Sequence, residues 1–541
     1  MSKDNLKQRR DVLKSLLVGG AAGALGSLSQ LALMREASAA SPAFSDYKAM
    51  VCVFLYGGND SFNMIMPTGG SHSDYAISRG NLSVADNPLD FGSGALTGGS
   101  GNPYYANGES SGAYLKGHYP IAGSDLGVNG VMPELAQLIA TKKASVVSNI
   151  GNLVQPVTRS AIQDGSATLP LFLFAHNQQQ RALQTGQGNN LNDVGWAGKI
   201  ADNWVGVNNN SPLGLNISYT GNDRMLIGKD SVPLAIGVGK PPRFSDMGKG
   251  VWDYHMDRRA LFKALHGIGS SSPTGRVSFS QSSAFASGDP FASLFSATSR
   301  KSMDVFDLLF EAFEGYQANY VSRDSYGNQL FSVPSSSQLG LSNVMGGGLL
   351  SQLGAVAKMV DIGATGSFQG GAYNRQIFMV SLGGFDTHSE QITKHPLLLR
   401  ELSLALSSFQ KALEDKGLAN KVTTFTMSDF GRTLGNNGDG TDHAWGAHHL
   451  VMGGDGSNQV GNFNGGQVIG SLPEMVLDGN DDYSDRGRII PTMAQDQLNA
   501  SLCRWFGVDN ALMPTIFPNL ANFAQTDGDI NSAYLSGLFN A

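Results

Sequence analysis

Short apolar runs that end in small or acidic residues are the feature that most limits how this chain can fold. The runs are four to seven residues long, are rich in Val, Ile, Phe and Met, and stop at Gly or at Ser-Asp. Runs of this kind are typical of central strands in a mostly parallel sheet that is covered on both faces. We expect strands at Ala49–Leu55, Ala144–Ile150, Gln376–Leu382, Lys421–Met427 and His449–Met452.

A helical pattern separates two of these runs. Apolar residues recur every three or four positions, which gives a helix one apolar face, and Gly417 then ends the pattern. Strands alternating with helices indicate an α/β fold, and we predict a three-layer sandwich around the sheet. The residues of the apolar face are Leu398, Leu402, Leu406, Phe409 and Leu413.

Glycine is abundant in the chain and charge is scarce. Of 541 residues, 69 are Gly and only 15% are charged, which favours glycine-bearing loops around a packed core. We expect a single domain over 44–541, with loop insertions near 68–129, 267–302 and 335–371 that border a site at one edge of the sheet. The net charge of −7 argues against binding to nucleic acid through bulk charge.

The first 39 residues have the pattern of a targeting signal. Arg9 and Arg10 precede an apolar stretch over 15–33, and Ala37-Ser38-Ala39 supplies a small-residue cleavage site. The segment resembles a twin-arginine export signal, which implies the translocase as a partner during export and a periplasmic or secreted protein. A plain secretory signal or a membrane anchor is the alternative, but glycines interrupt the stretch, so we expect no permanent membrane span.

The chain has two cysteines, Cys52 and Cys503. In an oxidising compartment they could form a disulfide, or both could be packed thiols, because each lies in an apolar segment. Two cysteines are too few for a zinc ribbon or an iron–sulfur site within this chain.

Acidic and imidazole side chains follow the predicted strands at the points where they end. In open α/β sheets ligands bind beyond the carboxyl ends of the strands. Carboxylates gathered there repel one another unless cations share the site, and Asp with His suits Zn, Mn or, with more oxygen ligands, Ca. The candidate metal ligands are Asp60, Asp386, His388, Asp429 and His443.

Bound divalent ions would polarise an anionic ester, and Arg432 would hold a phosphate or sulfate oxygen. Each residue also has a structural alternative. Asp60 and Asp386 could close turns, Asp429 could cap a helix, and Arg432 could belong to a structural ion pair.

Together with the N-terminal signal, these segments resemble the exported bacterial proteins called domain of unknown function 1501, which are placed near the alkaline phosphatase and sulfatase superfamily. The similar segments are Gly57–Asp60, Phe385–His388, Ser428–Thr433, Gly440–His443, Trp505–Val508 and Phe517–Leu520.

The resemblance implies an alkaline-phosphatase-like fold and a metal centre. It implies that Asp60 is a ligand after the first strand, that Asp386 and His388 serve one metal site, and that Asp429 and His443 complete the set. Phe430 stands where the superfamily usually has a His, so one ligand is missing from its expected place.

The nucleophile also departs from that pattern. Ala175 lies where relatives carry Ser, and no signature supports Ser61, Ser160 or Thr185 as a substitute. We consider His176 a candidate catalytic residue, as a ligand or general acid, with a structural histidine as the alternative.

Two functions follow from these observations. The first is an exported metal-dependent hydrolase that acts on phosphate or sulfate esters. The second is a non-catalytic periplasmic binding or assembly protein that keeps the fold. The sequence leaves open which of the two is correct, and so whether the chain is an enzyme.

Overall fold

The fold is described from a computed structural model. It covers residues 42–90, 114–208, 213–239, 315–339, 345–366, 372–457 and 459–540, together with Ser211 and a few residues between 305 and 313. The export signal predicted for 1–39 and the insertion near 267–302 lie outside these residues.

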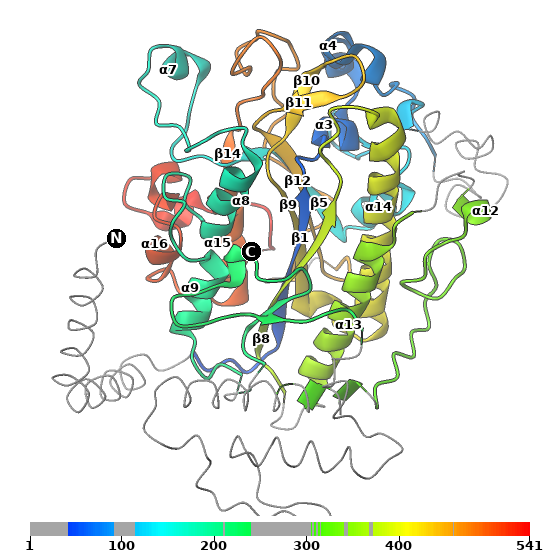
Figure 1. The fold of residues 1–541 in the computed structure, drawn as a ribbon, viewed down its shortest axis with the longest axis vertical. Coiled ribbons are helices and arrows are strands. Elements are labelled where there is room, and N and C mark those ends of the chain that lie inside the picture. The colour runs from blue at the N-terminus through cyan, green and yellow to red at the C-terminus, as the bar shows by residue number, and fades with distance from the viewer. Residues whose placement is uncertain are drawn as a thin grey trace, which may run out of the picture.

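A large, mostly parallel sheet forms the centre of the molecule (Figure 1). Its strands follow the order β13-β5-β12-β9-β1-β8-β6-β7, with β14 paired to β5. Only β12 runs antiparallel to its neighbours in the described part of this sheet. All five predicted strands are present, as β1 (Lys48–Tyr56), β5 (Ala144–Gly151), β8 (Arg375–Gly383), β9 (Val422–Ser428) and β12 (Ala447–Gly453), and the others are β6 (Asn216–Ser218), β7 (Leu234–Ala235), β13 (Val468–Ile469) and β14 (Met493–Ala494).

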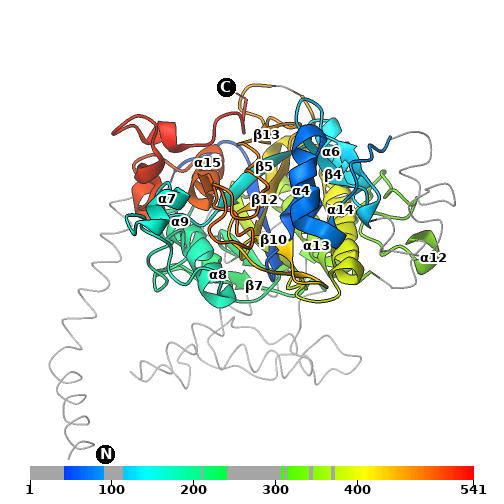
Figure 2. The same cartoon turned by 90° about the horizontal axis from the view of Figure 1, so that it is seen from above.

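Side chains of β1 alternate between two buried apolar layers because successive strand residues point to opposite faces. Val51 and Val53 join the cluster under α6 (Pro133–Ala140), α13 (Gly348–Thr365) and α14 (Gln391–Asp415). Met50 and Phe54 join the opposite cluster, with residues of α8 (His176–Thr185), α9 (Trp196–Asn203) and α15 (Gln495–Phe506). Figure 2 shows these helices on the two sides of the sheet, so the chain has a mixed α/β architecture in three layers.

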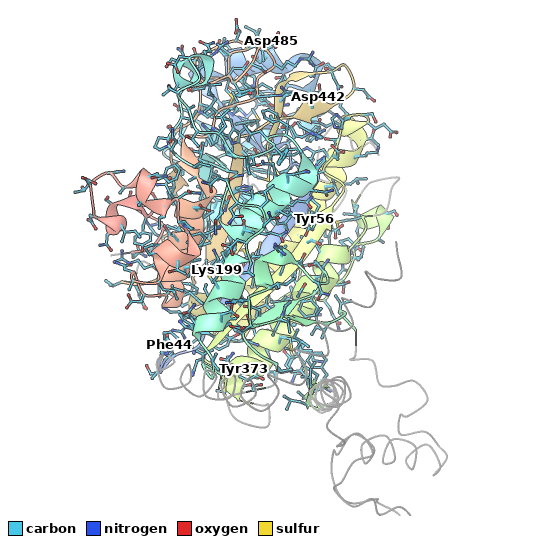
Figure 3. The ribbon with its side chains drawn as sticks, turned by 60° about the vertical axis from the view of Figure 1, so that its left-hand side comes forward. Phe44, Tyr56, Lys199, Tyr373, Asp442 and Asp485 are labelled. Carbon is cyan, nitrogen blue, oxygen red and sulfur yellow. The ribbon has the colours of Figure 1, made fainter. Side chains whose placement is uncertain are left out.

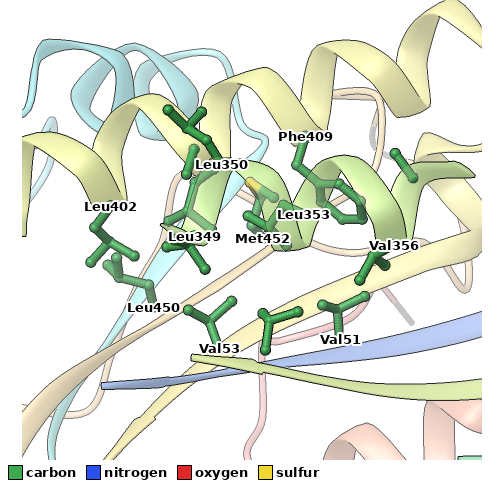
Figure 4. Packing of buried hydrophobic residues seen from close by; sticks show 14 of the residues in the cluster. Val51, Val53, Leu349, Leu350, Leu353, Val356, Leu402, Phe409, Leu450 and Met452 are labelled. Atoms are coloured by element: carbon green, nitrogen blue, oxygen red, sulfur yellow. The ribbon is translucent and has the colours of Figure 1, made fainter. Parts of the chain in front are cut away.

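Helix α13 corrects the prediction of a loop insertion over 335–371. Its apolar residues fall on one helical face that packs toward Val51 and Val53 (Figure 4). The Ser- and Gly-rich flanks hid this pattern in the sequence. The buried residues of this face include Leu349, Leu350, Leu353, Val356 and Val360. In the described ranges, neither α13 nor another helix is long and apolar enough to cross a membrane.

The predicted insertion near 68–129 is also partly ordered. Within its described residues, α4 (His72–Arg79) follows β2 (Ile65–Pro67), which pairs with β4 (Leu126–Asn129). β4 also pairs with β3 (His118–Pro120), which completes a small antiparallel sheet. This segment therefore contributes to the wall of the molecule at the end where β1 finishes.

Both cysteines are free and buried. Cys52 lies in β1 and Cys503 lies in α15, and both belong to the apolar cluster on the α15 side of the sheet. Of the two alternatives left open by the sequence, the structure shows packed thiols.

Candidate metal centre

The site lies where β1, β8 and β9 end, at one edge of the central sheet. Gly57 and Gly58 follow β1 with φ angles of +114° and +79°, which side-chain-bearing residues rarely adopt. A Cβ on Gly57 would lie 2.4 Å from the backbone N of Asp386, and one on Gly58 would lie 2.6 Å from the ring of Phe430. The two glycines therefore allow the three strand ends to approach one another.

Strands β10 (Arg432–Asn436) and β11 (Thr441–His443) form a hairpin over this edge. Asp442 on β11 lies toward the upper end of the molecule, above Tyr56, the last residue of β1 (Figure 3). The hairpin thus carries His443 to the segments that follow β8 and β9.

Three imidazoles and one carboxylate meet here. Nε2 of His388 lies 2.9 Å from Nε2 of His443 and 3.1 Å from Oδ1 of Asp386. The same Asp386 oxygen is 3.2 Å from Nε2 of His443, and its other oxygen is 3.6 Å from Nε2 of His176. In a tetrahedral site with metal–ligand bonds near 2.0–2.1 Å, ligand atoms lie roughly 3.3 Å apart. The separations in this cluster match that spacing.

In each imidazole the other ring nitrogen faces an oxygen. Nδ1 of His443 is 2.8 Å from the backbone oxygen of Phe174, and Nδ1 of His388 is 3.1 Å from Oδ1 of Asp442. A carbonyl and a carboxylate only accept hydrogen bonds, so Nδ1 carries the proton in both rings. Both Nε2 atoms are then lone pairs that face each other at 2.9 Å, an arrangement that needs a proton or a cation between them.

His176 has the same orientation. It is the first residue of α8, and its Nδ1 donates to Oδ2 of Asp429 over 2.6 Å. That oxygen also accepts from Nε2 of Gln180 at 3.0 Å and from the backbone N of Gly57 at 3.2 Å. Nε2 of His176 is buried and makes no hydrogen bond. Asp429 therefore holds His176 with its free nitrogen toward Asp386, as carboxylates behind metal-binding histidines do.

Arg432 fixes Asp386 from the protein side. Its NH1 group donates to Oδ1 of Asp386 over 2.8 Å and to the backbone oxygen of Gly57 over 3.3 Å. Its remaining nitrogens bond to Thr441, and the side chain is fully buried. The expected contact of Arg432 with a substrate anion is therefore not seen, because its donors are used within the protein.

The electrostatics favour the states that cation binding requires. Burial acts to raise the pKa of Asp386, but the hydrogen bond and charge of Arg432 outweigh it and hold that pKa below its usual value. Burial lowers the pKa of His443, and the charges of His176 and Arg432 lower it further. The hydrogen bond to Asp429 raises the pKa of His176. At neutral pH the cluster thus offers an ionised carboxylate beside a neutral imidazole of His443.

Asp60 does not join the cluster, which corrects its expected place. Its side chain is fully buried, one oxygen pairs with Arg79 of α4, and the other accepts from Nε2 of Gln391. Of the five predicted ligands, Asp386, His388 and His443 meet directly. Asp429 lies behind His176 as its hydrogen-bond partner.

The hydroxyl groups considered as nucleophiles have other contacts. Ser61 Oγ is buried and accepts from the backbone N of His448 over 2.7 Å, and Thr185 Oγ1 is buried against Ala182 O at 3.2 Å. Ser160 is on α7 (Arg159–Gln163), where its Oγ lies 3.0 Å from that of Thr158. None of the three is bonded to a residue of the cluster.

The segment before α8 is strained. Phe172 and Phe174 have φ angles of +53° and +70°, which are uncommon for bulky residues. The carbonyl group of Phe174 accepts from His443, and its ring lies under the guanidinium of Arg488 at 4.5 Å. Sequence patterns did not indicate Phe174 or Gln180 because one acts through its backbone and the other reaches Asp429 across more than 200 residues.

A family comparison covers part of this site. No curated protein matches the chain. The matched segment begins just before β8 and ends at the start of α15, so it contains Asp386, His388, Asp429, Arg432 and His443 but neither Asp60 nor His176. Residues 371–496 match the family described as a protein of unknown function (DUF1501).

Proposed function

We propose that the chain is a metal-dependent hydrolase of anionic esters, with one divalent cation held by His176, His388, His443 and Asp386. The observation that carries this proposal is the 2.9 Å separation of the His388 and His443 Nε2 atoms, both of which carry lone pairs. The buried Nε2 of His176, which has no hydrogen bond, supports it independently. A cation among these atoms would satisfy all three.

The donor set favours zinc or a similar transition ion. Imidazole nitrogen suits Zn, Cu, Fe and Ni, while Ca takes oxygen ligands. Three imidazoles and one carboxylate therefore narrow the expectation of Zn, Mn or Ca toward Zn, with Mn next.

The protein's own residues would position the ligands and leave the substrate side open. Asp429 orients His176, the Phe174 carbonyl orients His443, and Arg432 fixes Asp386. The side chains of Asp386 and His388 are 47% and 44% exposed, so a substrate could reach the centre from solvent. A bound divalent ion supplies a Lewis acid that polarises an ester oxygen and lowers the pKa of a nucleophilic water.

Water is the nucleophile in this proposal. Ala175 has no hydroxyl group, and Ser61, Ser160 and Thr185 are bonded elsewhere. Phosphate or sulfate esters are the proposed substrates, in keeping with the resemblance to the alkaline phosphatase and sulfatase superfamily. With the export signal predicted for 1–39, we expect the protein to act in the periplasm or outside the cell.

A binding or assembly protein is the second candidate. The buried side chain of Arg432 favours it, because the arginine expected to hold the substrate anion is committed to Asp386. Under this function the chain would bind a cation tightly and turn over no ester.

Metal analysis combined with ester assays tests the proposal. The purified protein should hold one equivalent of zinc or manganese and hydrolyse an aryl phosphate or aryl sulfate, and a chelator should stop hydrolysis. Asp386→Ala and His443→Ala should remove both metal and activity. His72→Ala, which changes a histidine bonded to the Val84 carbonyl outside the cluster, should keep both. Metal retained in Asp386→Ala would contradict the site, and bound metal without turnover would favour the binding function.

A further inference from the structure

A small cavity lies directly behind the candidate metal centre. Its volume is about 10 Å³, and its lining includes Phe174, Asp429, Phe430, His449 and Gln495. A space of about 10–15 Å³ on this measure accommodates one water molecule when polar groups surround it.

Three lining residues have a buried polar atom without a partner. These atoms are Oδ1 of Asp429, Nδ1 of His449 and Oε1 of Gln495. The residues are 1%, 4% and 2% exposed, so bulk water does not solvate them. A buried polar atom left without a hydrogen bond costs about 1–3 kcal/mol, and three around one cavity indicate a shared missing partner.

Donors and acceptors balance for a single water molecule. Burial lowers the pKa of His449 to about 4, so its ring is neutral near pH 7, and its Nδ1 can carry the proton. Gln495 donates through Nε2 to Oδ1 of Asn499 over 3.1 Å, which leaves Oε1 as an acceptor. Water accepts one hydrogen bond from His449 and donates one each to Asp429 and Gln495.

We infer that this cavity binds one water molecule, which connects Asp429 to His449 on β12 and to Gln495 on α15. Oδ2 of Asp429 already accepts from His176, Gln180 and Gly57. The water fixes the second oxygen, so both ends of the carboxylate are held.

His449 and Gln495 thereby become positioning residues for His176. His176 is held through Asp429, and Asp429 is held from the core by the water. The effect on metal binding rests on the proposed function, whereas the presence of the water does not.

A high-resolution crystal structure of the full-length protein tests the water itself. We expect one ordered water within hydrogen-bonding distance of Oδ1 of Asp429, Nδ1 of His449 and Oε1 of Gln495. An empty cavity, or direct hydrogen bonds among these three atoms, would overturn the inference whether or not the protein binds metal.

Gln495→Met tests the positioning role, since it removes the acceptor at similar size. We expect the affinity for cobalt or zinc to fall about tenfold, at the lower end of losses seen when groups behind metal ligands are changed. Thr424→Val is the matched control, because it removes another buried unpartnered oxygen, on β9 and outside the cavity lining, and should leave affinity unchanged.

The His176 Nδ1 proton gives a second readout in metal-free protein. Its NMR resonance should move in Gln495→Met and stay in place in Thr424→Val. Equal behaviour of the two variants would overturn the positioning role. If the wild-type protein bound no metal, the proposed function would fail, while this resonance and the crystal structure would still decide the inference.

Discussion

The Nε2 atoms of His388 and His443 lie 2.9 Å apart, although the two rings belong to segments separated by more than 50 residues. Each ring is fixed from behind, by Asp442 and by the Phe174 carbonyl, so neither can turn without losing a hydrogen bond. A geometry built to hold two lone pairs together is what a cation site needs before its ion arrives.

Asp429→Asn should weaken metal binding by about 10–100-fold, because His176 loses its ionised acceptor while keeping its place on α8. Competition titration with a chromophoric zinc chelator measures the change. Asp439→Asn is the control, since the carboxylate of Asp439 accepts from the backbone N of Glu390 and from no residue of the cluster. Equal affinities in the two variants would contradict the role given to Asp429.

Asp60→Asn should destabilise the fold while leaving the metal in place. The change leaves the Arg79 guanidinium buried without its carboxylate, and breaking a buried pair costs about 3–5 kcal/mol. Chemical denaturation gives the free energy of unfolding, and metal content is measured on the folded fraction. Loss of metal at unchanged stability would make Asp60 a ligand after all.

Acid should destabilise the protein through its buried neutral histidines. Burial lowers the pKa of His395 to about 4, while the unfolded chain titrates near 6.5. The unfolded state therefore binds the proton first, and stability falls as pH drops from 6.5 toward 4, by about 3 kcal/mol for this residue. His395→Gln should flatten the slope of unfolding free energy against pH by up to one proton across that window. An unchanged slope would show that His395 titrates normally in the fold.

Phe172→Gly should leave the protein equally stable or more stable. Phe172 adopts a φ of +53° and its side chain is 63% exposed, so the change relieves strain of roughly 1 kcal/mol and removes little packing. Thermal unfolding compares this variant with Leu173→Gly, which has no such strain to relieve. A large drop in melting temperature for Phe172→Gly would mean that the exposed ring has a partner in solution.

Both thiols should resist modification in the native protein. Burial raises the pKa of Cys52 and of Cys503, which suppresses the reactive thiolate. Titration with a thiol reagent should find no rapid reaction under native conditions and two thiols after denaturation. Fewer than two thiols in denatured, unreduced protein would indicate a disulfide.

The sequence predicted the sheet better than the layers around it. Strands such as Ala49–Leu55 were identifiable because both faces are buried and the whole run is apolar. α13 was missed because Gly346, Gly347 and Gly348 precede its apolar face and suggested a loop. Its packing against β1 decides the conformation, and single-sequence patterns do not contain that contact.

For the site, the strand-end rule selected Asp386, His388 and His443, which do meet. It could not separate them from Asp60, because the partner of Asp60 is Arg79 on α4, inside a segment that looked like a loop. Arg432 failed for a similar reason, since its burial under the β10–β11 hairpin depends on tertiary contacts.

His176 comes from a segment roughly 200 residues before Asp386 and His443. An ion held by all three would tie together parts of the chain that fold as separate strands and helices, and it could bind only after they had assembled. Because binding to the native state alone adds to its stability, metal supply would then set how well the finished molecule withstands heat and proteases.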